Sequence, residues 1–105
     1  MIRPGNRRIE FNQLLKKITG CENVYFQPPE SLKIKYPAII YNRDDMKLRK
    51  ADDQVYTATT RYNVVVVDKN PDSELIHKLL KLPMIYYGRH YTADNLNYDT
   101  FEVFY

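Results

Sequence analysis

The sequence predicts an α+β fold: a two-layer sandwich in which two helices pack on one face of a four- to five-stranded mixed or antiparallel sheet, with a long polar hairpin arm. Two segments have apolar residues at helical spacing, and several others are rich in β-branched and aromatic residues. The chain has 105 residues, which is too short for two ordinary domains. We therefore expect residues 1–105 to form a single domain.

The first helix is expected over residues 6–20. Its apolar residues recur at positions i, i+3, i+4 and i+7, which gives one buried stripe on an otherwise polar helix. Glycine at position 20 favours the end of the helix. A short strand is expected at 23–26, and the two prolines that follow cannot continue the hydrogen-bond ladder of a sheet. The residues of the stripe are Phe11, Leu14, Leu15 and Ile18.

Two strands are predicted in the middle of the chain, at 36–42 and 57–68. Residues 64–67 are four consecutive valines. An unbroken apolar run of this kind is typical of a central strand that is covered on both faces at that end.

The second helix is expected after residues 70–74, whose Asn, Asp and Ser favour a cap and whose Pro suits a first helical turn. Two strands, 84–91 and 98–105, follow as a hairpin with a polar turn. We expect the outer face of the sheet to carry many of the ten tyrosines. The helix is expected to bury Leu75, Ile76, Leu79, Leu80 and Leu82. The least exposed residues of the chain are expected to include Val65, Val67, Leu75, Leu79 and Leu80.

The charge of the chain changes sign along its length. The net charge is +3, but residues 1–50 contribute +6 and residues 51–105 contribute −3. The single cysteine, Cys21, has no partner for an internal disulfide, which favours a reducing compartment. No apolar run has the length of a signal peptide or a membrane span, so we expect a protein that is neither exported by that route nor embedded in a membrane.

The sequence contains no recognisable catalytic, metal or cofactor motif. The two histidines, His77 and His90, are far apart, and the three glycines do not form a phosphate-binding loop. His90 is expected to make a local hydrogen bond near Asp94 rather than a catalytic dyad. Cys21 has no neighbouring base or cation to activate it. We therefore expect no enzyme, no cofactor and no metal.

Residues 43–58 are too polar for the core and form a long connection for so small a domain. Two interpretations remain open: an exposed hairpin without a partner, or an arm that reaches a neighbouring subunit. In the second case the candidate contact residues are Arg43, Lys47, Arg49, Lys50, Asp52 and Asp53.

Three segments carry a resemblance to a protein family: YPAIIY at 36–41, RYNVVVVDKNPDSE at 61–74 and RHYTADNLNY at 89–98. Together they resemble the small tail-terminator or tail-completion (head–tail joining) proteins of tailed bacteriophages, over most of residues 5–105. The resemblance implies a structural virion protein of the phage neck and tail, assembled in the host bacterial cytoplasm. It implies a homohexameric ring that ends the tail tube and contacts the tail tube protein and the head connector or head-closure protein. DNA would only pass through the lumen of this ring, and no membrane would be involved.

Other functions remain open from the sequence. The chain is compatible with another ring of the neck, such as a head-closure or adaptor protein. A soluble enzyme would need a convergent polar pocket, which the sequence does not indicate. A small DNA-binding accessory module would use the basic residues near the N-terminus, and its binding would fall steeply with salt. These basic residues are Arg3, Arg7, Arg8, Lys16 and Lys17.

Overall fold

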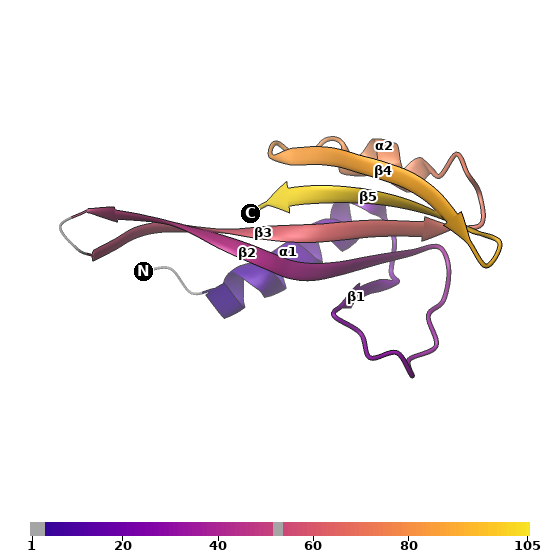
Figure 1. Cartoon of the computed structure of the whole chain (residues 1–105), viewed down its shortest axis with the longest axis horizontal. Coiled ribbons are helices and arrows are strands. Elements are labelled where there is room, and N and C mark those ends of the chain that lie inside the picture. Colours follow the sequence, from indigo (N-terminus) through magenta and orange to yellow (C-terminus); the bar gives the residue numbers. More distant parts are fainter. Residues whose placement is uncertain (1–3, 52–53) are drawn as a thin grey trace.

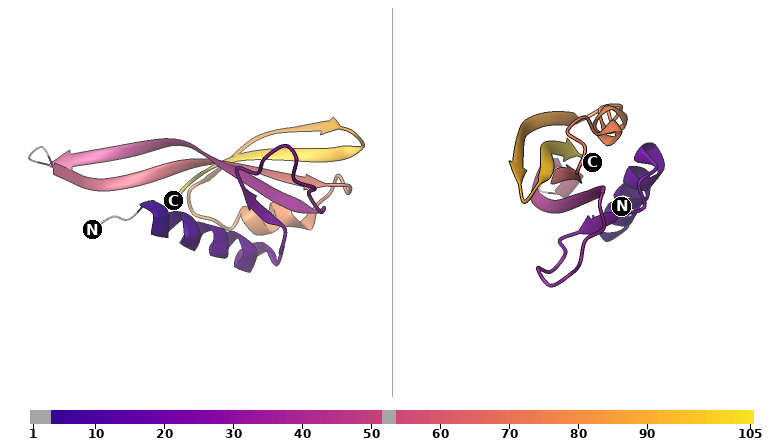
Figure 2. Two further views of the ribbon diagram at one scale, coloured as in Figure 1. Left: turned by 90° about the horizontal axis from the view of Figure 1, so that it is seen from below. Right: turned by 90° about the vertical axis from the view of Figure 1, so that its right-hand side faces the viewer.

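The chain folds into two layers, a five-stranded mixed sheet and two helices that cover one of its faces (Figure 1, Figure 2). This computed structural model describes residues 4–51 and 54–105, with side chains for 7–44 and 59–105. The predicted α+β class is confirmed. The elements, in chain order, are α1 (Pro4–Thr19), β1 (Val24–Phe26), β2 (Ala38–Ala51), β3 (Gln54–Asp68), α2 (Glu74–Leu79), β4 (Ile85–Ala93) and β5 (Leu96–Phe104).

The strands lie in the order β1-β2-β3-β5-β4. β1 runs parallel to β2, and the other neighbouring pairs are antiparallel. β3 is central because it pairs with β2 on one side and with β5 on the other. β1 and β4 are therefore the two edge strands.

The first helix buries the predicted stripe. Phe11 and Leu15 are completely buried, and Leu14 and Ile18 pack partly against the same core. The helix ends as predicted: Gly20 has φ +71, a conformation that favours glycine, and its N–H donates to the Lys16 carbonyl at 2.9 Å.

Two of the ten tyrosines lie in the core rather than on the outer face of the sheet. Tyr41 and Tyr62 are buried in the core beneath α1, where the ring of Phe11 stacks on Tyr62 with a centroid distance of 4.5 Å. Tyr41 tolerates burial because its hydroxyl donates to Asn12 Oδ1 at 2.7 Å. Burial raises the pKa of both phenols above the ordinary value of 10.0.

The valine run of β3 is covered on both faces at its end, as predicted. Val66 and Val67 are adjacent, face opposite sides of the sheet and are both completely buried. The expected burial of Val65 is wrong, since Val65 is only half-buried. Val65 and Val67 lie on the outer face of the sheet, whereas Val64 and Val66 face the helices. The outer face is therefore fully covered at Val67 but only partly covered at Val65.

The second helix is shorter than expected, with only six residues. Ser73 caps it by accepting a hydrogen bond from the Leu75 N–H at 3.3 Å. Leu75 and Leu79 are buried as predicted, but Leu80 is 47% exposed. The helix ends at Leu79, so Leu80 falls at the C-cap and the chain turns. Ile76 is half-buried, and Leu82 is buried beyond the helix end.

Candidate interaction surface

The hairpin of β2 and β3 projects from the body of the molecule as a two-stranded ribbon (Figure 1). β3 pairs with β5 only from Arg61 onward, and one further pair of hydrogen bonds joins Thr60 to Tyr105. Before that point β2 is the only described strand beside β3. The molecule is 52 Å long, against 27 and 23 Å in its other directions. We call residues 45–51 and 54–59 the arm.

Polar contacts secure the root of the arm. Asp44 and Arg61 form an ion pair across the two strands, with Oδ2 at 2.7 Å from Nη2 and at 2.8 Å from Nε. Arg43 is exposed, and its backbone N–H donates to Gln27 Oε1 at 3.2 Å. These contacts join the root of the arm to β3 and to the segment that follows β1.

Three further candidate residues from the sequence lie beyond the root of the arm. Lys47, Arg49 and Lys50 are on the β2 strand of the arm, and the strand register shifts between Arg49 and Lys50. Asp52 and Asp53 lie outside the described residues. The backbone thus places the three basic residues on one strand of the projecting ribbon.

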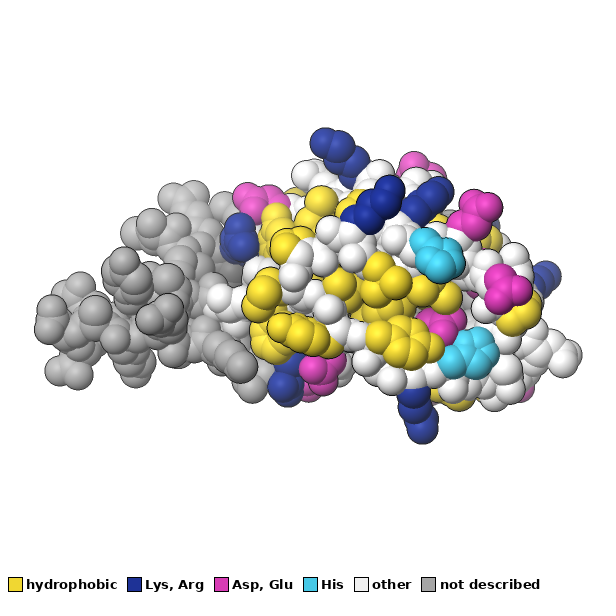
Figure 3. All heavy atoms as spheres, turned by 90° about the horizontal axis from the view of Figure 1, so that it is seen from above, with side chains coloured by type: hydrophobic (Ala, Val, Ile, Leu, Met, Phe, Trp, Pro, Cys, Tyr) yellow, Lys and Arg dark blue, Asp and Glu magenta, His cyan; other side chains and the backbone are white. Residues whose placement is uncertain are grey.

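Edge strand β4 forms a second surface, which the sequence did not indicate. Every residue of β4 except Ile85 is exposed. Apolar side chains gather on this side of the molecule, away from the arm, and both histidines are visible there (Figure 3). The tyrosine-rich composition of 84–91 was the available signal. We use the name β4 surface for the exposed residues Leu80, Met84, Tyr87 and His90. Tyr86 is also exposed, but strand alternation turns it to the opposite face of the sheet from Tyr87.

A buried carboxylate lies beneath the β4 surface. Asp99 of β5 is only 4% exposed. Its Oδ1 accepts a hydrogen bond from the Tyr87 hydroxyl at 2.8 Å and lies 2.9 Å from His90 Nδ1. The hydrogen bond to Asp99 raises the pKa of Tyr87 above its ordinary value, because the neighbouring carboxylate disfavours a phenolate. His90 therefore contacts Asp99, and the prediction that it makes a hydrogen bond near Asp94 is wrong.

A β-bulge makes this cluster possible. Tyr87 and His90 are three positions apart, so a regular strand would place them on opposite faces. The register of β4 shifts between these two residues, which places Tyr87 opposite Phe101 and His90 opposite Asp99 on one face of β5.

Thr100 secures the bulge at Gly88 and Arg89. The Arg89 N–H donates to Thr100 Oγ1 at 2.9 Å, and the same hydroxyl contacts the Arg89 carbonyl at 3.3 Å. A Cβ at Gly88 would overlap Thr100 Oγ1 and would lie 3.1 Å from the Thr100 carbonyl oxygen. Position 88 therefore requires glycine, because Thr100 lies too close to leave room for a Cβ atom.

We expect Gly88→Ala to lower the free energy of unfolding by about 1–3 kcal/mol, because the new methyl group overpacks against Thr100. Chemical denaturation of the full chain measures this change. In a Thr100→Ala background the clash with the hydroxyl is absent, so the cost of Gly88→Ala should be smaller. If Gly88→Ala lowers the free energy of unfolding equally in both backgrounds, the Thr100 hydroxyl does not limit the space at Gly88.

The other chemical candidates lie apart from this cluster. Burial raises the pKa of the Cys21 thiol, whose Sγ lies 3.6 Å from the Pro37 carbonyl oxygen. His77 is exposed on α2. Within 4–51 and 54–105, no group of three His, Cys, Asp or Glu side chains is placed to hold a metal ion.

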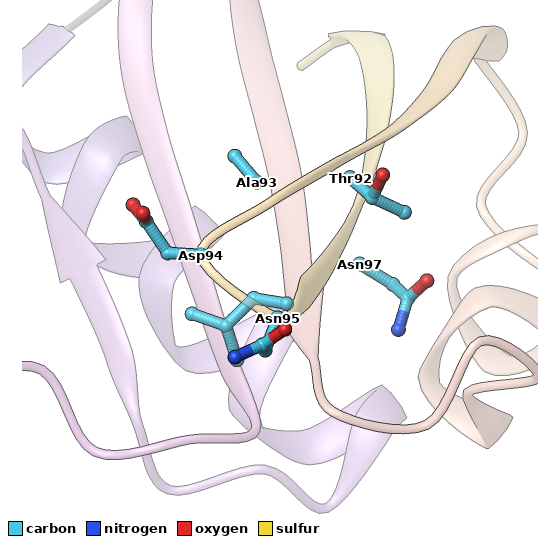
Figure 4. A pocket seen from close by; sticks show the side chains of 6 residues that line it. Thr92, Ala93, Asp94, Asn95 and Asn97 are labelled. Carbon is cyan, nitrogen blue, oxygen red and sulfur yellow. The ribbon is translucent and has the colours of Figure 1, made fainter.

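A hollow at the β4–β5 turn is formed by six consecutive residues (Figure 4). Asp94 and Asn95 adopt positive φ values of 53 and 63, as a two-residue hairpin turn requires. Asp94 points away from Asn97, whose amide donates to the Lys69 carbonyl at 3.1 Å. The polar groups of the hollow therefore do not converge on a common point.

A scan against protein-family models and a search of curated proteins found no match for this chain. Among the described residues, no helix has the length and apolar character needed to cross a membrane. The function of the chain is therefore inferred from its own sequence and surfaces.

Proposed function

We propose that this chain is a structural subunit of a bacteriophage neck, which forms a ring that terminates the tail tube and joins it to the head connector or head-closure protein. The observation that carries the proposal is the presence of a projecting two-stranded arm and an exposed β4 surface on separate parts of one small molecule (Figure 1, Figure 3). A ring needs this property, because each of its interfaces joins two different patches of identical subunits.

The arm supports the proposal because a two-stranded hairpin without a third strand or a helix on its face is only marginally stable in water. In the described residues the arm projects beyond the strands that would cover it. Contact with a second molecule would supply the missing neighbour. The charge difference between residues 1–50 and 51–105 also favours contact between unlike parts of two copies.

The segments that resemble phage tail-terminator proteins meet at one end of the sheet, opposite the arm. The register places Ala38 beside Val67, and Asp68 beside Asn97. These pairs join the segments 36–41, 61–74 and 89–98. The three segments therefore lie side by side on the part of the sheet that we propose to face the tail tube or the head connector.

The proposal includes no catalytic activity and no cofactor: the ring is a hexamer in the virion, assembled in the bacterial cytoplasm, with DNA only passing through its lumen. A DNA-binding module is less well supported. The guanidinium of Arg7 lies 4.2 Å from the centre of the Tyr105 ring, and that of Arg8 lies 4.6 Å from the centre of the Phe26 ring. Two of the basic residues required for DNA binding thus pack on rings of the chain itself.

Native mass spectrometry and electron microscopy of the purified full chain, alone and mixed with tail tubes, test this function. We expect a closed ring of six copies, in solution or on the tube end. A chain that stays monomeric in both conditions would contradict the proposal. Monomers that bind DNA with steep salt dependence would instead support the accessory DNA-binding module.

A further inference from the structure

We propose that the arms of neighbouring copies pair edge to edge, the β3 strand of one arm with the β2 strand of the next, through backbone hydrogen bonds. The inference rests on the proposed ring and identifies how its subunits are joined. It goes beyond the ring itself, since many pairs of patches are compatible with a closed ring.

Both outer edges of the arm are open in the part of the chain that the structure describes. On one side, β1 pairs with β2 only as far as Tyr41. On the other side, the last backbone hydrogen bonds between β3 and the body join Thr60 to Tyr105, at 3.2 and 3.0 Å. The arm extends beyond this point and beyond α1 (Figure 2). An open strand edge carries unpaired N–H and C=O groups, which the edge of another strand can bind.

The backbone of Ala58 faces the open edge of β3. The Thr60 N–H and C=O both bond to Tyr105 and therefore point away from β2. Backbone groups of an antiparallel strand alternate between its two sides, so those of Ala58, two positions earlier, point the same way. β2 and β3 pair without a register shift from Asp45 to Arg49, and this stretch includes Ala58. The edge at Ala58 is therefore regular enough to accept a further strand.

The two edges of the arm differ in sequence. Residues 54–59 of β3 include no charged residue and no proline, and they contain valine, tyrosine and threonine, which favour strands. Residues 45–51 of β2 include four charged residues. Like charges on facing strands are destabilising, and charged residues hinder pairing between two edges. Pairing of a β3 edge with a β2 edge brings no like charges opposite each other, whereas pairing of two β2 edges would do so.

The symmetry of a ring selects the same two edges. All arms of a cyclic ring point the same way, so two arms that lie side by side face each other with different strands. β2 and β3 run in opposite directions along the arm. The β3 strand of one arm and the β2 strand of the next are therefore antiparallel, and the arms of all copies form one continuous sheet.

Proline at position 58 tests the open edge. Ala58→Pro removes an N–H that points away from β2, so the hydrogen bonds within the arm are retained. We expect ring assembly of the full chain, measured by native mass spectrometry, to weaken by about tenfold through the loss of one hydrogen bond at each contact. Thermal unfolding of the isolated subunit should not change. Ala58→Val keeps the N–H and is the matched control, which should assemble as the unmodified chain does.

Cross-linking identifies which strands meet. One variant of the full chain carries Ala58→Cys on β3, the other carries Leu48→Cys on β2, and the two are produced together and treated with a short bis-maleimide. We expect about tenfold more cross-linked dimer than from either variant produced alone, because a strand never faces its own copy in the ring. The unmodified chain, whose Cys21 is buried, gives the background.

These measurements separate the possible failures. Rings that form normally with Ala58→Pro, or without excess cross-linking between positions 48 and 58, would overturn the pairing of arms and leave the proposed ring intact. An equal loss of assembly in Ala58→Pro and Ala58→Val would also count against backbone pairing. Strong cross-linking of Ala58→Cys alone would show a two-fold contact between β3 edges and would overturn the inference. Monomers of the unmodified chain would overturn both proposals.

Discussion

Leu79→Ala is expected to lower the free energy of unfolding by about 2–5 kcal/mol, which is a large part of the stability of a small domain. The Leu79 side chain is completely buried and belongs to the core formed by both helices and the sheet. α2 has only six residues, so packing rather than intrinsic helix stability holds it in place. Urea denaturation with an unchanged slope measures the loss.

Leu80→Ala is the matched control for this substitution. The same side chain is truncated one position further along, but Leu80 is exposed at the end of α2. Its substitution should change the free energy of unfolding by no more than about 0.5 kcal/mol. Equal losses of unfolding free energy at the two positions would show that Leu79 does not lie on the buried side of α2.

The double reversal of Arg49 and Lys50 to Glu is expected to weaken ring assembly by at least about tenfold at low salt, while folding is retained. The two changes place negative charge on an arm that we propose to contact a neighbouring subunit. The effect should decrease as salt increases, because ions screen exposed charges. Native mass spectrometry measures assembly, and thermal unfolding of the isolated subunit measures folding.

Lys33→Glu with Lys35→Glu makes the same change in net charge elsewhere. Both lysines are exposed in the connection between β1 and β2, away from the arm. This control should assemble as the unmodified chain does. Normal assembly of the arm reversal would make the arm an idle surface hairpin, and the interface would have to be sought elsewhere on the tyrosine-rich strands.

Local patterns in the sequence predict most of the elements of the fold. The apolar spacing from Phe11 to Ile18 and the glycine that follows predict α1 and its end, because both signals act within one or two helical turns. The unbroken valine run predicts a strand covered on both faces. The errors at Val65 and Leu80 concern how far neighbouring segments cover a side chain, and this depends on the exact ends of elements and on segments that are distant in the sequence.

The arm and the β4 surface also differ in how far the sequence predicts them. The sequence by itself determined that residues 43–58 form a long polar segment with candidate contact residues, because polarity and length are local properties. Only the tertiary structure decided that β4 is an edge strand, because the strand order is set by pairing between distant segments. It also decided that Tyr87 and His90 share Asp99, because their spacing places them on opposite faces until the bulge at Gly88 turns the strand.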